Sequence, residues 1–289
     1  MKKRILHILC GRTIFLVVFF IGLLTFLYPL ISSNINHRSQ TQVISNYDEK
    51  MDRMEEGERQ RQREEAVRYN AYVKDLEGSR SETITPREKE AMERVNIEMK
   101  NIGEVLGYVE IPRIDIELPI YYGESDEILS RGAGLMPKTS LPVGGDSTHC
   151  VISAHRGLPS ARMFRDLDQM EIKDVFFLHA AQETLAYEVE SVRVVLPTDI
   201  SALEIEEGRD LVTLITCDPY MINSHRMLVR AHRTEYNEGV KAKSQDRKIS
   251  PLVKYREYLF VIVFFAILIL FIKFIQTRVK KRTYEENWK

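Results

Sequence analysis

Three side chains that can take part in acyl transfer lie in separate segments of the chain. Cys217 ends the strand-forming run DLVTLITC, and Arg226 follows across the turn-forming segment DPYMINSH. His155 ends another apolar run, HCVISAH. A thiolate attacks a carbonyl carbon when a base or a cation is near it, and a guanidinium stabilises the oxyanion that forms. If neighbouring strands end at one rim of a sheet, these three side chains can meet there.

Each of these residues also has a structural interpretation. Cys217 can be a buried core thiol, His155 a hydrogen-bonded structural histidine and Arg226 a surface cation. In a strand, alternation puts Arg230 on the same face as Arg226, so Arg230 is the alternative for the cationic role. Four other histidines are not spaced as metal ligands, so we expect structural roles for them and no metal site. They are His149, His179, His225 and His232.

Charge and hydropathy point to a membrane rather than to nucleic acid. The chain has 289 residues and a formal net charge of -1, so it lacks the basic field of a nucleic-acid-binding protein. Residues 14–31 carry no charge over 18 positions, about 27 Å of helix, which is enough to span a bilayer core of about 30 Å. Residues 258–272 form a second uncharged run.

The flanking cations predict the topology. Lysines and arginines precede the first apolar run and follow the second, so both termini are expected in the cytoplasm and the segment between the runs outside the cell. The protein is therefore predicted to lie in the cell membrane with two transmembrane spans. Cleavage of the first run as a signal peptide is the alternative, but the run is long and no A-x-A-like site follows it.

The cysteines leave two interpretations open. Cys10 borders the first apolar run, so Cys150 and Cys217 are the two cysteines expected outside the membrane. They can form a disulfide there. Alternation in the 149–155 run, however, groups Cys150 with Ile152 and Ala154, which is typical of a small buried apolar residue.

Composition divides the chain into five segments. Residues 1–33 are a cytoplasmic tip and transmembrane helix, and residues 257–289 are a second transmembrane helix with a basic tail. Residues 34–100 mix acidic and basic side chains densely and predict exposed helices, a solvated stalk or a lid-like region, with one helix at about 86–100. Residues 237–256 are expected to be a polar linker.

Residues 101–236 predict an all-β barrel or sandwich. From about residue 103 the pattern changes to period-two alternation broken by proline and glycine. Short strands are predicted at 149–155, 175–180, 186–197, 210–217 and 225–233, and residues 161–170 predict a helical turn or two. Many short strands between turn signals are typical of closed or packed antiparallel architectures.

The motifs resemble those of one enzyme family. The TLITC strand is similar to the signature of sortases, the membrane-anchored cysteine transpeptidases of Gram-positive bacteria, and SAHRG at 153–157 resembles their histidine motif. The order histidine, cysteine, arginine also matches. Two anchors, the segment before the barrel and the run from Cys217 to Val229 resemble the class C, pilus-assembling branch.

This resemblance implies an eight-stranded β-barrel with short helices, preceded by a helical extension and flanked by two transmembrane helices. His155, Cys217 and Arg226 would form the catalytic triad, while Leu214 and Thr216 of the signature strand would bind substrate. Cys217 would attack the Thr–Gly carbonyl of an LPxTG-like sorting signal on a pilin subunit. Arg226 would stabilise the oxyanion and His155 would protonate the leaving amine. A lysine of the next pilin would resolve the thioacyl intermediate, and no cofactor is needed.

The sequence departs from class C at the lid. Those enzymes commonly carry an Asp-Pro-aromatic lid motif before the barrel, and residues 34–100 contain no such tripeptide. We therefore expect residues 46–100 to form a helical cover or stalk without that plug. One alternative function is a sortase that anchors proteins to the cell wall or mainly hydrolyses its substrate. Another is a non-catalytic, membrane-tethered binding module in which Cys150 and Cys217 are oxidised.

Overall fold

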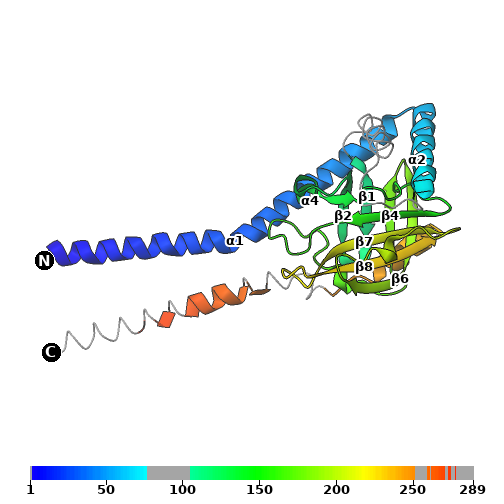
Figure 1. Ribbon diagram of the computed structural model, residues 1–289. Coiled ribbons are helices and arrows are strands. Elements are labelled where there is room, and N and C mark those ends of the chain that lie inside the picture. The colour runs from blue at the N-terminus through cyan, green and yellow to red at the C-terminus, as the bar shows by residue number, and fades with distance from the viewer. Residues whose placement is uncertain are drawn as a thin grey trace. The chain divides into compact units, whose positions relative to one another are not determined.

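A closed barrel of eight strands forms the core of the structure (Figure 1). The computed structural model describes residues 2–76, 105–250, 259–260, 262–270, 273–274 and 277. Around the barrel the strand order is β1-β2-β3-β4-β7-β8-β6-β5. The strands are β1 (Val105–Ile111), β2 (Ile116–Tyr122), β3 (Ala133–Leu135), β4 (Thr148–Ser153), β5 (Val175–Ala180), β6 (Glu183–Val195), β7 (Asp210–Asp218) and β8 (His225–Thr234). The predicted all-β barrel is confirmed.

Strand β7 occupies the position that matters for the site, because it pairs with β4 on one side and β8 on the other. It runs parallel to β4, with Ser153 beside Ile215, and antiparallel to β8. Strands covered on both faces read as continuous apolar runs rather than as alternating ones. The segment from Leu211 to Thr216 is buried throughout, which matches that pattern.

The two faces of the β4–β7–β8 sheet have different coverings. One face carries small or apolar side chains that are at most 4% exposed, as expected for a barrel interior: Cys150, Ile152, Val212, Leu214 and Val229. The other face is covered by the connection from β6 to β7, which contains the short helix η4 (Ser201–Leu203). There the buried cluster consists of Val151, Leu203, Ile215 and Leu228.

Two helices before the barrel pack on it. Helix α1 (Lys2–Arg53) contacts β1 and β2, and α2 (Glu56–Leu76) follows it (Figure 1). Each buries one stripe at helical spacing. In α1 the buried residues are Gln40, Ile44, Tyr47 and Met51, and in α2 they are Ala66, Tyr69, Asn70 and Val73.

Polar groups fix these helices to the barrel. The Tyr47 hydroxyl accepts from the Ala181 amide at 3.2 Å. Asn70 is 3% exposed and bonds both backbone groups of Leu141, accepting from its N–H at 2.7 Å and donating to its carbonyl at 3.3 Å. Of the two predicted alternatives, a helical cover or a solvated stalk, the described part of the extension favours the cover, since a buried stripe and paired polar groups join it to the barrel. The helix predicted at 86–100 lies outside the described residues.

The predicted linker also packs on the barrel at its start. Residues 238–246 form α5 (Glu238–Asp246), capped by Asn237, whose side chain accepts from the Val240 amide. Just beyond it, Arg247 donates to the Lys173 carbonyl at 3.0 Å and lies 3.2 Å from Asp174. The polar composition of this segment predicted a tether. The contacts of Arg247 could not be predicted, because Lys173 and Asp174 are distant from it in sequence.

The membrane prediction is supported at the N-terminal end. Within the described residues, the part of α1 that begins at Phe19 is long and apolar enough to cross a membrane. Among residues 258–272 of the second predicted span, residues 259–260 and 262–270 are described and helical. A second helix of spanning length is not shown by the described residues, and the rest of this prediction falls on residues outside them.

Candidate active site

Cys217 and Arg226 are direct partners across two strands. Cys217 is the penultimate residue of β7, Arg226 is the second residue of β8, and the antiparallel register sets them opposite each other. Residues opposite each other in a ladder project from the same face of the sheet. Both residues are half-buried, so the thiol and the guanidinium share one partly accessible surface at the end of the barrel.

His155 belongs to the neighbouring strand end. Strands β4 and β7 are parallel, and their ladder continues past Ser153 through a bond from the Ala154 amide to the Ile215 carbonyl at 3.1 Å. Counting on by two residues in each strand from the register pair Ser153 and Ile215 brings His155 and Cys217 to equivalent positions, on strands about 4.8 Å apart. The structure therefore brings the chain segments of all three predicted triad residues to one rim.

The cross-strand row formed by Cys217 and Arg226 extends to β6, where Val195 is opposite Arg226. Beneath Cys217 on this face, Ile215 and Leu228 belong to the buried cluster under η4. The floor of the site is therefore apolar and rigidly packed, and its polar groups are concentrated at the rim. A thiol in such a place is backed by hydrophobic packing yet is open on one side.

The guanidinium of Arg226 is held by backbone oxygens. Its Nη1 donates to the carbonyl of Asn223 at 3.2 Å and to that of His225 at 3.0 Å. Among the described residues, no carboxylate forms an ion pair with this guanidinium, and its acceptors are neutral. By contrast, Arg230 ion-pairs with Glu190 at 2.8 Å and also with Glu206. Of the two candidates, Arg226 is the one suited to stabilise a developing anion.

Cys150 does not share the surface of Cys217. Cys150 is 4% exposed and pairs in register with Val212, so it faces the barrel interior, whereas Cys217 lies on the opposite face. Both thiols are free. Burial raises the pKa of the Cys150 thiol, with a further contribution from the charge of Asp210. The predicted disulfide alternative is therefore wrong, and Cys150 is a core residue as alternation predicted.

The two residues expected to bind substrate are buried in the barrel. Leu214 is 0% exposed and Thr216 is 2% exposed. The Thr216 hydroxyl donates to the Ala154 carbonyl at 2.8 Å, which ties β7 to the segment that leads to His155. Neither side chain reaches the surface that carries Cys217. We therefore do not include them in the substrate surface proposed below.

Sequence reasoning missed an exposed apolar loop beside the thiol. In the connection from β7 to β8, Tyr220, Met221 and Ile222 are 43%, 66% and 71% exposed. The loop packs on the segment after His155, since a Cβ at Gly157 would lie 3.2 Å from Met221 Cγ; with φ at +98° there, glycine is the residue that fits. The pattern DPYMINSH indicated only a turn, because exposure depends on where the neighbouring segments lie.

Other histidines have protein partners. His149 is buried, with Nδ1 2.8 Å from the Glu204 carbonyl and Nε2 2.8 Å from Thr213 Oγ1. His179 Nε2 lies 3.0 Å from Glu110. His225 bonds Ser224 at 2.9 Å, and His232 lies 3.3 Å from Glu190. These contacts agree with structural roles. Across the described ranges, we find no group of three or more His, Cys, Asp or Glu that could hold a metal ion.

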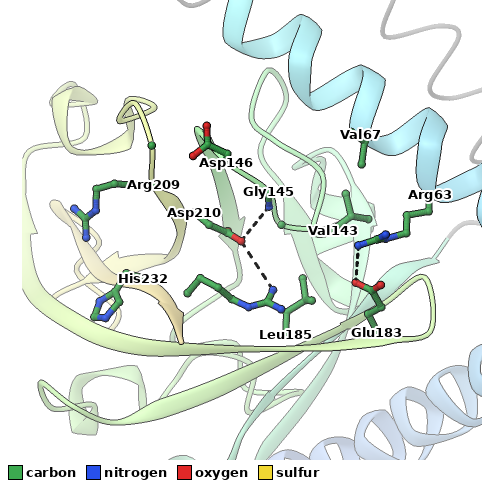
Figure 2. Close-up of a pocket in the computed structure, with 13 residues that line it drawn as sticks. Arg63, Val67, Val143, Gly145, Asp146, Glu183, Leu185, Arg209, Asp210 and His232 are labelled. Carbon is green, nitrogen blue, oxygen red and sulfur yellow. Dashed lines mark hydrogen bonds and ion pairs between the residues drawn. The ribbon is translucent and has the colours of Figure 1, made fainter. Parts of the chain in front are cut away.

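An open cleft of about 660 Å³ lies at the other end of β7. Its walls come from α2, the 143–146 loop and the starts of β6 and β7 (Figure 2). Figure 2 shows Asp210 bonded to Gly145, and Arg63 paired with Glu183 across the cleft. The Tyr187 hydroxyl also donates to Asp210, at 2.9 Å.

The charges of this cleft are largely compensated. Burial raises the pKa of Asp210 above its usual value of 3.8, while bonds from Gly145 and Tyr187 act in the opposite direction. Arg233 lies 3.9 Å from the same carboxylate. Many polar groups that line the cleft thus already bond to each other.

Comparisons with known proteins agree with this arrangement. The family model described as Sortase domain matches residues 109–234. Sortase A of Staphylococcus aureus is 32% identical over 124 residues, which span 42% of this chain and 59% of that protein. The curated relative is thus matched over less than two thirds of its own length.

Solved structures cover more of the chain. Sortase C of Streptococcus pneumoniae is 44% identical, with a TM-score of 0.59, and the match covers 68% of this chain and 97% of that one. Sortase C of Clostridium perfringens, solved with a C-terminal cell wall sorting motif, is 39% identical, with a TM-score of 0.58, over 68% of this chain and 100% of that one. The sequence motifs, the closed barrel and these matches lead to one conclusion: the chain belongs to the sortase family.

Proposed function

We propose that this protein is a membrane-anchored cysteine transpeptidase of class C that polymerises pilin subunits. The observation that carries the proposal is the cross-strand pairing of Cys217 with Arg226, beside the strand end that leads to His155. Nucleophile, cation and acid–base group are the parts that acyl transfer through a thioacyl intermediate requires. The sortase C matches support the choice of class.

In the proposed reaction, the Cys217 thiolate attacks the Thr–Gly carbonyl of an LPxTG-like sorting signal. Arg226 stabilises the oxyanion, a role that suits a guanidinium held by carbonyls rather than by a carboxylate. His155 protonates the departing glycine amine, and the acyl group stays on sulfur. A lysine amine of the next pilin then attacks the thioester, which forms an isopeptide bond and releases the thiol. No cofactor enters these steps.

The exposed apolar loop and the apolar end of β6 support peptide binding near the thiol. Met221 and Ile222, in the loop that follows Cys217, are 66% and 71% exposed, and Val195, which is half-buried, lies opposite Arg226 on the face that carries Cys217. A sorting signal with apolar side chains can bury area against such surfaces at about 25 cal/mol per Å². This surface, rather than the charged cleft near Asp210, is the proposed substrate site.

The experiment uses the full chain in detergent with a pilin that carries both a sorting signal and an acceptor lysine. Polymerisation predicts a ladder of covalent multimers, and a pilin whose acceptor lysine is replaced by arginine should still be cleaved but should form no ladder. A single cleaved product from the intact pilin would instead indicate a hydrolase. Transfer only to a cell-wall peptide amine would indicate an anchoring sortase.

A further inference from the structure

A buried arginine joins the two strand ends that carry the proposed catalytic residues. Arg156 directly follows His155, and Asp218 directly follows Cys217. Arg156 Nη1 donates to Asp218 Oδ1. The arginine side chain is only 7% exposed and that of Asp218 is 19% exposed. An ion pair buried to this degree has a defined geometry, because either charge alone would be costly to bury.

The remaining nitrogens of Arg156 are also engaged. Its Nη2 lies 3.0 Å from Asp168, and its Nε donates to the Arg165 carbonyl at 3.2 Å. With contacts on all three nitrogens, the planar guanidinium has a fixed orientation. It therefore joins β7, the end of β4 and the segment around η3 (Leu167–Gln169).

This contact lies where the backbone ladder stops. Within the described residues, the last β4–β7 backbone bond runs from the Ala154 amide to the Ile215 carbonyl. Beyond it, the Thr216 hydroxyl reaches back to Ala154, and the next direct link between the two ends is Arg156–Asp218. Beyond the ladder, this ion pair acts together with the bond from the Phe164 amide to the His155 carbonyl at 3.0 Å and with the packing of Met221 near Gly157.

The pair also sets the local charge next to the thiol. Asp218 is adjacent to Cys217, and a carboxylate without a cation there would disfavour the thiolate. Arg156 compensates that charge from the β4 side. Among the described residues, the other charged or titratable groups near Cys217 include Arg226 on β8, Arg193 on the same face of β6, His155 after β4, and His225, which is opposite Asp218 in the register.

We propose that Arg156 and Asp218 form a clamp that positions His155 against Cys217 and keeps the thiol free of an uncompensated carboxylate. Arg156 is thus a positioning residue, since it acts through the two residues it aligns. This inference rests on the proposed function for the roles of His155 and Cys217. The clamp itself follows from the contacts of Arg156.

The test compares three variants of the full chain in detergent. Arg156→Ala is expected to lower kcat about 10- to 100-fold with KM within about twofold, because misplaced catalytic groups slow the chemical step. Asp218→Asn is expected to lower kcat about tenfold, because Arg156 keeps its other two partners. The double variant should be no slower than Arg156→Ala alone, as expected for residues that act through one contact.

A second readout separates the clamp from general loss of structure. The rate of Cys217 alkylation is followed against pH, with the labelled site mapped by mass spectrometry. Arg156→Ala leaves the Asp218 carboxylate without this cation and should shift the midpoint up by about half a pH unit, whereas Asp218→Asn removes the negative charge next to Cys217 while Arg156 keeps Asp168, and should shift the midpoint down. The double variant should return the midpoint to that of the wild type.

Arg113 provides the matched control. It is 17% exposed, lies 3.1 Å from the buried Asp174 and donates at 2.6 Å to the carbonyl of Gln169, the last residue of η3. Arg113→Ala should destabilise the fold while leaving kcat and the alkylation midpoint unchanged. If Arg156→Ala behaves like Arg113→Ala in both readouts, the clamp is wrong. If the wild-type protein is alkylated at Cys217 but does not join two substrates, the proposed function is wrong. The clamp can still be tested in that case, because the shifts of the alkylation midpoint in the two single variants do not require transpeptidation.

Discussion

The two ends of β7 differ in how their polar groups are used. At the Asp210 end, defined by Asp210, Gly145, Tyr187 and Arg233, a buried carboxylate is surrounded by donors and a cation. At the Cys217 end, defined by Cys217, Arg226 and His155, two neutral backbone carbonyls hold Arg226. Within the described part of the chain, we find no hydrogen bond to the Cys217 thiol or the His155 ring.

The difference shows why size alone does not identify a site. The Asp210 end has the cleft of about 660 Å³, but its charges are neutralised by their neighbours. At the Cys217 end, packed apolar residues lie behind the reactive groups, and the contacts of the described residues leave these groups able to bond to a substrate. Reactive groups with spare bonding capacity are a better indicator of chemistry than volume is.

The largest effect is expected at the Cys217 end. Cys217→Ala removes the nucleophile and should reduce transpeptidation at least about a thousandfold, while Cys150→Ala, in the barrel interior, should keep the wild-type rate within about twofold. Both are measured as product formed by the full chain from a sorting-signal substrate and an amine. Equal losses in the two variants would remove the distinction between the core thiol of Cys150 and the half-buried thiol of Cys217.

Arg226→Ala should have the next largest effect, since an oxyanion donor contributes about 100- to 1,000-fold to kcat. Arg230→Ala serves as the control because Arg230 lies on the same face but is paired with Glu190 and Glu206. Its variant should change kcat by less than about threefold. Steady-state kinetics of the two proteins decide the assignment, and a larger loss for Arg230→Ala would transfer the cationic role to that residue.

Near the Asp210 end, mutation should affect stability rather than rate. Asn70→Ala leaves the backbone groups of Leu141 without their side-chain partner and should lower the free energy of unfolding by about 2 kcal/mol. Asn46→Ala, at an exposed position of α1, is the control and should be close to neutral. Denaturant unfolding measures the difference, and kcat should not change in either variant; a large drop in kcat for Asn70→Ala would link α2 to the reaction.

The smallest effect is expected for Asp210→Asn, which should keep kcat within about twofold. Because burial raises the pKa of Asp210, the folded wild type binds its proton more tightly than the unfolded chain does. The wild type therefore gains stability on acidification, and this gain is lost as pH rises through the raised pKa. The melting temperature of the variant minus that of the wild type should therefore be larger at pH 7.5 than at pH 4.5. A difference that is independent of pH would contradict the shift.

Local sequence signals were sufficient for the barrel and for the triad segments. Strand propensity and alternation predicted the strand at 175–180 with its observed bounds, and the strand containing Cys217 to within one residue. The rim could be predicted because Cys217, Arg226 and His155 each lie at a strand end. Their convergence required only that the three strands be neighbours.

Contacts between distant segments could not be predicted in this way. Polar composition indicated a solvated stalk at 34–76, but the Asn70 side chain is buried against Leu141, 71 positions away. The same holds for the link between Arg156 and Asp218, which are 62 positions apart. A polar or charged residue is predicted to be exposed when its partner is unknown. These contacts can therefore be identified only in the folded structure.

The most direct test of the account is to identify the atom that carries the acyl group. The full chain is mixed with a sorting-signal peptide in the absence of an acceptor amine, quenched in acid and analysed by intact mass and by peptide mapping. We predict one adduct with the mass of the peptide up to its threonine, bound to Cys217 and released by hydroxylamine. Turnover of the peptide without any adduct at Cys217, or with an adduct at another residue, would contradict the account.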